Sequence, residues 1–244
     1  MIELQNLTKR YDRFLAVDNL NLQIGAGEIF GFIGPNGAGK TTTIRMMGGL
    51  LMPSAGSVRI DGLDMADVPV AVKKKIGFIP DRPYLYEKLT GMEFLFFMAD
   101  LYSLEDQGLE DKANDLLRKF ALFNWRHDLI ESYSHGMKQR LIIAAALLHD
   151  PKVIIVDEPM VGLDPAAVKM VKDIFRGLAE AGKTIFMSTH TLSVAENLCD
   201  RIGIIHKGSL VALGTMTELK NTTNLWDGDL EEVFIRLTEG NDLP

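Results

Sequence analysis

The sequence GPNGAGKTT, at residues 34–42, has residue types and a spacing suited to holding phosphate. It matches the pattern G-x-x-x-x-G-K-[ST] and follows the apolar segment IFGFI, as a phosphate loop between a strand and a helix does. Its glycines let backbone N–H groups converge on phosphate oxygens, and the helix adds its positive N-terminus. An ordinary glycine-rich turn is the alternative. The residues predicted to contact the phosphates of a bound nucleotide here are Gly34, Asn36, Gly37, Ala38, Gly39, Lys40, Thr41 and Thr42.

Two of these side chains have predicted roles of their own. Lys40 is expected to reach the β and γ phosphates, and the Thr41 hydroxyl is expected to bind Mg²⁺. A site of this kind needs an acidic partner for the metal ion. The sequence VIIVDEP at 153–159 supplies one, because Asp157 ends a short apolar run typical of a buried strand.

Glu158 follows Asp157 directly and is predicted to polarise the water that attacks the γ-phosphate. Two adjacent carboxylates at the end of an apolar strand are hard to explain structurally, since burying unpaired charge costs several kcal/mol. A helix N-cap is the alternative explanation. Asp164-Pro165, a few residues later, already has the form of a helix start.

His190 ends a third apolar segment, IFMSTH at 185–190. A lone histidine there is more often structural. Because the carboxyl ends of parallel strands meet at one ligand crevice, a γ-phosphate contact is the better interpretation beside the phosphate loop and the acidic pair.

A fourth polar cluster, YSHGMKQR at 133–140, precedes an apolar run from Leu141 to Leu148 that would form a helix unaided. Ser134 can cap that helix, and the first N–H groups of the helix can also form an anion site. The two roles are compatible.

The elements that must position these residues are strands alternating with helices. Residues 2–33 are predicted to form antiparallel strands, and 76–80, 153–157 and 184–188 to form parallel strands covered by helices. The T-x-x-E sequence from Thr90 predicts a capping box and a helix start. The predicted fold is therefore an α/β phosphate-loop (P-loop) ATPase core with a mostly parallel sheet, an N-terminal antiparallel β subdomain and an inserted α-helical subdomain.

The corresponding domain boundaries are 1–89 for the first part of the ATP-binding core, 90–150 for the helical subdomain and 151–217 for the second part of the core. Residues 218–244 are predicted to be a C-terminal helical tail, in which Asp229 can cap a last helix.

Composition excludes several classes of protein. The 244 residues can bury a large core, and the single Cys199 excludes an internal disulfide framework and a cysteine-based zinc site. The longest apolar run, of eight residues, falls short of the roughly 20 that a membrane helix needs. The net charge of −7 and one short basic run, at 73–75, do not suggest nucleic-acid binding.

The order of these motifs resembles the ATP-binding cassette (ABC) family, the nucleotide-binding subunits of ABC transporters. The resemblance covers nearly the whole chain, from Tyr11 through the phosphate loop and Asp81 to His190. Its most specific feature is a signature sequence, here YSHGMKQR, one short helix before the acidic strand, and GLD at 162–164 follows that strand. In that family two cassettes pair head to tail, and the signature helix of one covers the γ-phosphate held by the other. The resemblance implies that Ser134, with the N–H groups of His135 and Gly136, completes such a site.

Three further roles rest on the resemblance. Tyr11 would stack on adenine, with the alternative that it only covers the sheet. Asp164 would lie in the loop that crosses the dimer interface, and Asp81 would hold Mg²⁺ through water. The family usually has Gln where Asp81 stands, and Leu-Ser-Gly-Gly-Gln in the signature, so Tyr133, His135 and Met137 are departures.

The resemblance implies an ATPase subunit that dimerises around two ATP, with a second copy or a paired cassette, and drives transport through separate membrane subunits. The ending LEEVFIRLTEG is most similar to cassettes of bacterial exporters. The expected location is the cytoplasm, peripheral on the inner face of the cell membrane. Two alternatives are a cassette ATPase acting on ribosomes or DNA and a regulator that binds nucleotide without hydrolysing it.

Overall fold

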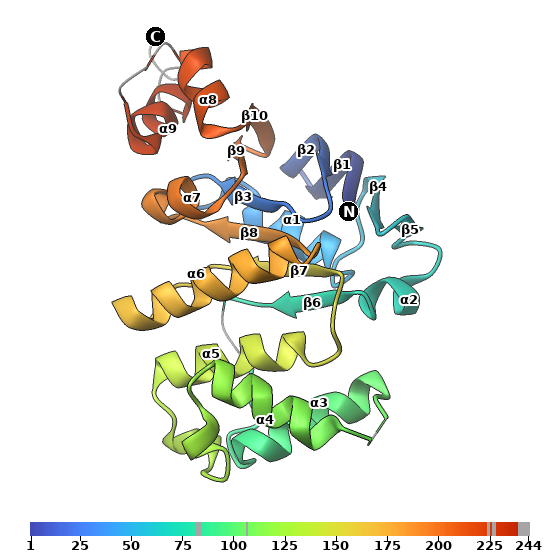
Figure 1. Ribbon diagram of the computed structural model, residues 1–244. Coiled ribbons are helices and arrows are strands. Elements are labelled where there is room, and N and C mark those ends of the chain that lie inside the picture. Colours follow the sequence, from blue (N-terminus) through green and yellow to red (C-terminus); the bar gives the residue numbers. More distant parts are fainter. Residues whose placement is uncertain (82–83, 106, 224, 226–227, 239–244) are drawn as a thin grey trace.

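The computed structural model describes residues 1–244 except 82–83, 106, 224, 226–227 and 239–244. The end of LEEVFIRLTEG and the last residues of the predicted tail thus lie outside the described residues. The described chain contains two sheets, a group of helices at one end and two helices near the C-terminus at the other (Figure 1).

The larger sheet carries the predicted parallel strands. Its order is β10-β9-β3-β8-β7-β6, in which only the pair β9–β10 is antiparallel. The strand bounds are Ile29–Ile33 (β3), Ile76–Ile79 (β6), Val153–Asp157 (β7), Thr184–Thr189 (β8), Arg201–His206 (β9) and Ser209–Gly214 (β10). The fold class is confirmed.

Strand β7 shows why these segments are continuously apolar. Ile154 and Val156 pack into one hydrophobic cluster with the helices, whereas Val153 and Ile155 pack into a second cluster under the other sheet. A strand covered on both faces needs apolar residues at every position rather than at alternate ones.

The smaller sheet is antiparallel, with the order β2-β1-β4-β5. Its strands are Ile2–Tyr11 (β1), Phe14–Ile24 (β2), Ala55–Ile60 (β4) and Leu63–Asp64 (β5). The prediction that 2–33 is antiparallel throughout is wrong at its end, because β3 pairs in parallel with β8 and β9. All five residues of β3 are buried, as suits the centre of the parallel sheet.

The helices lie on both sides of the larger sheet and beyond its ends. Their bounds are Lys40–Met47 (α1), Pro69–Lys73 (α2), Gly91–Tyr102 (α3), Leu109–Lys119 (α4), His135–Leu147 (α5), Pro165–Glu180 (α6), Leu192–Leu198 (α7), Met216–Thr223 (α8) and Leu230–Thr238 (α9). The capping box at Thr90 is present, and Asp229 caps α9. Helix α8 begins two residues before the proposed tail boundary. The domain boundaries stay predictions.

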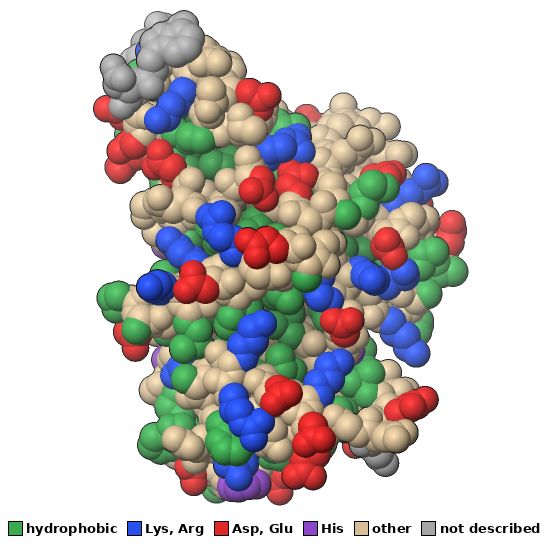
Figure 2. Space-filling view, viewed as in Figure 1, with side chains coloured by type: hydrophobic (Ala, Val, Ile, Leu, Met, Phe, Trp, Pro, Cys, Tyr) green, Lys and Arg blue, Asp and Glu red, His purple; other side chains and the backbone are tan. Residues whose placement is uncertain are grey.

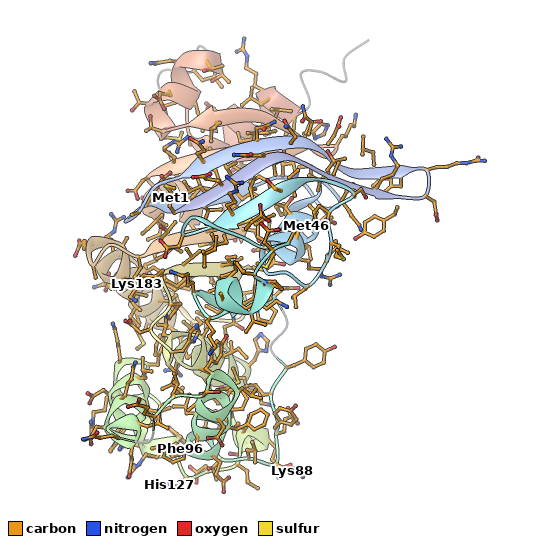
Figure 3. The ribbon with its side chains drawn as sticks, turned by 90° about the vertical axis from the view of Figure 1, so that its right-hand side faces the viewer. Met1, Met46, Lys88, Phe96, His127 and Lys183 are labelled. Carbon is orange, nitrogen blue, oxygen red and sulfur yellow. The ribbon has the colours of Figure 1, made fainter. Side chains whose placement is uncertain are left out.

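The helical region, α3 to α5, lies at the end opposite the smaller sheet. Phe96 and His127 mark it in Figure 3, far from Met1 and Met46. On the face shown in Figure 2, basic and acidic side chains are interspersed over α6 and the helices below it. This face therefore presents no continuous basic surface of the kind that nucleic-acid binding requires.

Candidate functional site

The phosphate loop joins β3 to α1, as the sequence predicts. Gly39 sits immediately before α1 with φ +112°, a left-handed conformation that favours glycine. A Cβ on Gly39 would also come within 2.5 Å of the Ala16 carbonyl oxygen, so the loop is pressed against β2.

Lys40 begins α1 and points back into the loop. Its Nζ donates hydrogen bonds to the carbonyl oxygens of Gly34 (2.6 Å) and Pro35 (3.1 Å), and only 8% of the residue is exposed. Burial lowers the pKa of Lys40, while the nearby carboxylates of Glu158 and Asp157 act in the opposite direction. The result is a desolvated cation already held at the centre of the loop.

Asp157 ends β7 and is 5% exposed. Its Oδ1 accepts a hydrogen bond from the Ser188 hydroxyl on the neighbouring strand β8, and its Oδ2 accepts one from Thr41 Oγ1 at 3.3 Å. Both oxygens of this buried carboxylate are thereby engaged, which a buried charge requires. The contact with Thr41 brings together the two side chains predicted to hold Mg²⁺.

Glu158 has a strained backbone, with φ +52° at a residue other than glycine. Its N–H donates to the Ser188 carbonyl at 3.1 Å, and no helix starts here, so the helix N-cap interpretation is wrong. Its Oε1 lies 2.8 Å from His190 Nδ1, and the Glu158 side chain is 12% exposed against 62% for His190. The histidine is thus positioned to orient the predicted base.

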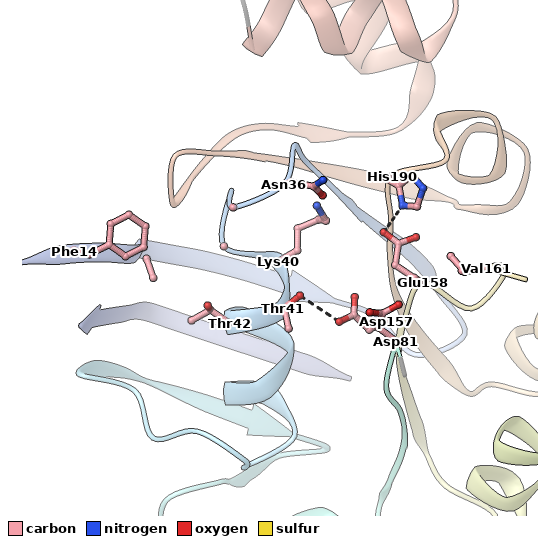
Figure 4. Close-up of a pocket in the computed structure, with 13 residues that line it drawn as sticks. Phe14, Asn36, Lys40, Thr41, Thr42, Asp81, Asp157, Glu158, Val161 and His190 are labelled. Carbon is pink, nitrogen blue, oxygen red and sulfur yellow. Dashed lines mark hydrogen bonds and ion pairs between the residues drawn. The ribbon is translucent and has the colours of Figure 1, made fainter. Parts of the chain in front are cut away.

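These groups surround one cavity of about 480 Å³ (Figure 4). Lys40, Glu158 and His190 converge on it from different elements, and Asp81 and Asp157 both line it. The wall of the cavity consists of Phe14, Ala16, Asn36, Gly37, Gly39, Lys40, Thr41, Thr42, Asp81, Asp157, Glu158, Val161 and His190.

The cavity wall includes residues that the sequence did not single out. Phe14 and Ala16 are two positions apart on β2 and therefore face the same side of the strand. Tyr11 is not part of this wall. The residue is 44% exposed, and the Lys9 ammonium lies 5.1 Å from the centroid of its ring. The adenine role of Tyr11 stays a prediction, with Phe14 as a rival aromatic.

The oxygen donors in the cavity suit Mg²⁺. This ion is usually bound by one or two carboxylates and hydroxyls together with substrate phosphates and water. Thr41, Asp157 and Asp81 offer such a set on one side of the cavity. The residues present therefore fit the ion.

Ser134, Gly136 and Asp164 do not line the cavity of their own chain. Ser134 Oγ accepts a hydrogen bond from Met137 N (3.2 Å) and caps α5, and Asp164 Oδ1 accepts one from Ala167 N (2.7 Å) and caps α6. Both capping interpretations are confirmed. Ser134 and Asp164 are exposed, so each remains accessible to another molecule.

A second cavity, of about 560 Å³, shares Thr41, Asp81 and Asp157 with the first. Its lining is mixed and includes the apolar side chains of Leu50 and Tyr84, which are 63% and 91% exposed. Among the residues that the structure describes, every helix is too short or too polar to cross a membrane.

The sequence model described as ABC transporter matches residues 17–161, more than half of the chain. The chain belongs to the ABC transporter family. It is 35% identical over 239 residues to the ABC-type transporter ATP-binding protein EcsA of Bacillus subtilis, covering 98% of this chain and 97% of that protein. It is 38% identical over 219 residues to the linearmycin resistance ATP-binding protein LnrL of the same species, covering 90% of this chain and 70% of the other.

Solved structures agree with this membership. The structure described as the ATP-binding subunit of an ABC transporter superimposes with a TM-score of 0.92 at 34% identity, covering 97% of this chain and 99% of that one. A dimeric post-hydrolysis state of the ATP-binding cassette MJ0796, bound to ADP and Pi, has a TM-score of 0.79 at 28% identity, covering 88% and 98%.

Family membership establishes the general activity. The cassette is the ATP-binding, ATP-hydrolysing subunit of an ABC transporter, which works with a second cassette and with membrane subunits.

Proposed function

We propose that this cassette hydrolyses ATP at a site completed by a second cassette and thereby drives export through separate membrane subunits. The observation that carries the proposal is the convergence of Lys40, Thr41, Asp157, Glu158 and His190 on one cavity. Ser134 is the missing half, because it is exposed at a helix start away from that cavity.

The proposed chemistry assigns each side chain a task. Lys40 binds the β and γ phosphates. Glu158 accepts a hydrogen bond from the attacking water, and the contact with His190 orients the Glu158 carboxylate. The hydroxyl of Ser134 and the N–H groups at the start of α5, supplied by the second cassette, stabilise charge on the γ-phosphate. A bound Mg²⁺ would neutralise phosphate charge, with Thr41 and Asp157 as ligands and Asp81 acting through water.

The second cavity supports a proposal about the membrane partner. Exposed Leu50 and Tyr84, with Phe78 and Arg45, form an amphipathic groove that suits a short helix of a membrane subunit. Asp81 and Asp157 line both cavities. Movement of that helix would therefore change the surroundings of the bound nucleotide. Docking here would hold the cassette peripherally at the inner face of the membrane.

The aromatic residues near this groove divide into two groups. Phe94 is 2% exposed and belongs to the core, whereas Tyr86 is 61% exposed and packs edge-on against Phe97 with ring centroids 5.0 Å apart. Tyr84 and Tyr86 are therefore the aromatic side chains proposed to meet the partner.

Export as the direction is proposed from relatives. The daunorubicin/doxorubicin resistance ATP-binding protein DrrA of Streptomyces peucetius is 40% identical over 221 residues, covering 91% of this chain and 67% of that protein. The name of this relative refers to resistance to daunorubicin and doxorubicin. It therefore supports the proposal that the transporter of this chain exports an organic molecule.

The test is the mass in solution of Glu158→Gln with and without ATP, by light scattering on a sizing column. This substitution removes the base but leaves the phosphate loop intact, so ATP should convert monomer into dimer. ADP and the double variant Lys40→Ala/Glu158→Gln are the controls, and both should remain monomeric. A chain that binds ATP and stays monomeric would contradict a shared site in the isolated protein.

A further inference from the structure

The start of α5 touches the loop that follows Glu158 in the same chain. Gly162 has φ +75°, and a Cβ built on it would lie 2.0 Å from Cδ2 and 2.6 Å from Nε2 of His135. The imidazole ring therefore lies directly against the Gly162 backbone. A Cβ on Gly136 would come within 3.3 Å of the Gly162 carbonyl oxygen, so the two backbones are also close.

This loop is short and fixed at both ends. At its start, the Glu158 carbonyl accepts a hydrogen bond from Val161 N at 3.3 Å, and Glu158 itself is paired with His190. At its end, Asp164 caps α6. A shift of Gly162 must therefore be absorbed near Glu158, because few residues separate the two.

The start of α5 is fixed independently of the loop. Arg140 Nε donates to the Gly136 carbonyl (3.2 Å) and Arg140 Nη1 donates to the Phe120 carbonyl (2.8 Å), which anchors the first turn within the helical region. The His135 ring is exposed and makes no hydrogen bond to the described residues. The ring lies close to the Gly162 loop. In Figure 1 the first turns of α5 and α6 lie on the same side of the molecule.

We propose that His135 is a positioning residue whose ring holds the loop at 160–163 against the start of α5. The inference rests on the proposed function, which places the start of α5 at the ATP of the second cassette. His135 then links Glu158, which acts on the chain's own ATP, to the helix start that senses the partner's ATP. Binding at one site would adjust the base at the other.

The link works through shape rather than charge, since the ring lies against the Gly162 backbone and makes no hydrogen bond to the described residues. His135→Phe should therefore preserve it, whereas His135→Ala should release the loop. The usual signature of the family has glycine at this position, so the contact is a property of this chain's departure from that pattern.

Paired substitutions in the full-length chain test the contact, with steady-state ATP hydrolysis measured across ATP concentrations. Gly162→Ala places a methyl group where the ring lies and should lower kcat about tenfold or more. His135→Ala/Gly162→Ala should recover several-fold of that loss, because the ring is gone, whereas His135→Phe/Gly162→Ala should recover none. His135→Ala alone should reduce the Hill coefficient for ATP.

Two controls separate this link from general strain. Gly182→Ala imposes a similar left-handed φ of +85° where a Cβ meets open space, and His127→Ala removes another exposed histidine of the helical region. Both should hydrolyse ATP as the unsubstituted chain does.

The inference is overturned if the double variant is no more active than Gly162→Ala, or if His135→Ala retains the Hill coefficient for ATP. Failure of the proposed function has a different signature, in which Lys40→Ala still binds ATP or Glu158→Gln still hydrolyses it.

Discussion

The phosphate-loop cavity and the start of α5 differ in what holds their functional groups. Lys40 and Asp157 are 8% and 5% exposed, and each is held by partners within the chain. Ser134 and His135 are exposed, and the Ser134 hydroxyl makes only its local cap. The cavity therefore holds its proposed nucleotide-binding groups within one chain, whereas the Ser134 hydroxyl is accessible to another molecule. A single chain should bind ATP but should not hydrolyse it efficiently.

The largest expected effect comes from Lys40→Ala, which alters the phosphate-loop cavity. Removing the buried ammonium should weaken ATP affinity about 100-fold or more, since charge-assisted contacts to phosphate are lost in a desolvated site. Calorimetric titration with ATP measures this directly. Lys169→Ala, at an exposed position on α6, is the matched control and should bind ATP normally.

The second prediction concerns the exposed region and separates the two roles of Ser134. Ser134→Ala should cost about 1 kcal/mol of stability through the lost cap. Ser134→Asp keeps a good capping residue but places a negative charge opposite the partner's γ-phosphate. In the Glu158→Gln background both substitutions should weaken the ATP-dependent dimer, and Ser134→Asp should weaken it more than Ser134→Ala. The melting temperature of Ser134→Asp should nevertheless stay near that of the unsubstituted chain.

Thr90→Ala is the control for this prediction, because it removes the capping box of α3 in the same helical region. It should lower the melting temperature and leave dimerisation intact. Equal dimer formation in Ser134→Asp and the unsubstituted chain would contradict the assignment of Ser134 to a shared site.

The contrast between the regions also explains what the sequence could predict. The phosphate loop, the acidic pair and the helix caps are local chemistry, in which a few adjacent residues specify the backbone, and the structure contains all of them. The Ser188–Asp157 hydrogen bond and the His135–Gly162 contact join residues distant in sequence, so no local pattern announces them. Strands β4 and β5 and the pairing of β3 were missed for the same reason. Strand pairing depends on contacts between residues distant in sequence, as in the pairs β1–β4 and β3–β8.

The third prediction concerns the edge of the cavity and asks whether Phe14 or Tyr11 stacks on the adenine. Base stacking on an aromatic ring contributes about 1–3 kcal/mol, so Phe14→Ala should weaken ATP affinity about tenfold if its ring is the platform. Tyr11→Ala should then change the affinity little. A larger loss in Tyr11→Ala would instead support the assignment based on the family and require the β1–β2 hairpin to move over the adenine.

The last prediction concerns the joint between the two regions, where His149 follows the end of α5. Its Nε2 donates to the Ile76 carbonyl at the start of β6 (3.0 Å), and its ring stacks on Tyr102 of α3 with centroids 3.8 Å apart. Nδ1 is buried without a hydrogen-bond partner among the described residues, which disfavours a proton on this nitrogen. His149 thus contacts both α3 and β6 where the helical region meets the core.

Burial lowers the pKa of His149 below its ordinary value of 6.5, and the cations Lys112 and Lys183 act in the same direction. The hydrogen bond to Ile76 and the charge of Asp150 oppose the shift but do not cancel it. Below about pH 6.5 the unfolded chain therefore takes up a proton that the folded chain does not, and stability falls with pH until the folded-state pKa is reached. His149→Gln should flatten this part of the stability profile by up to one proton, measured by urea unfolding between pH 5 and 7.5. His127→Ala, at an exposed histidine, should keep the slope, and an unchanged slope in His149→Gln would show that the joint does not titrate.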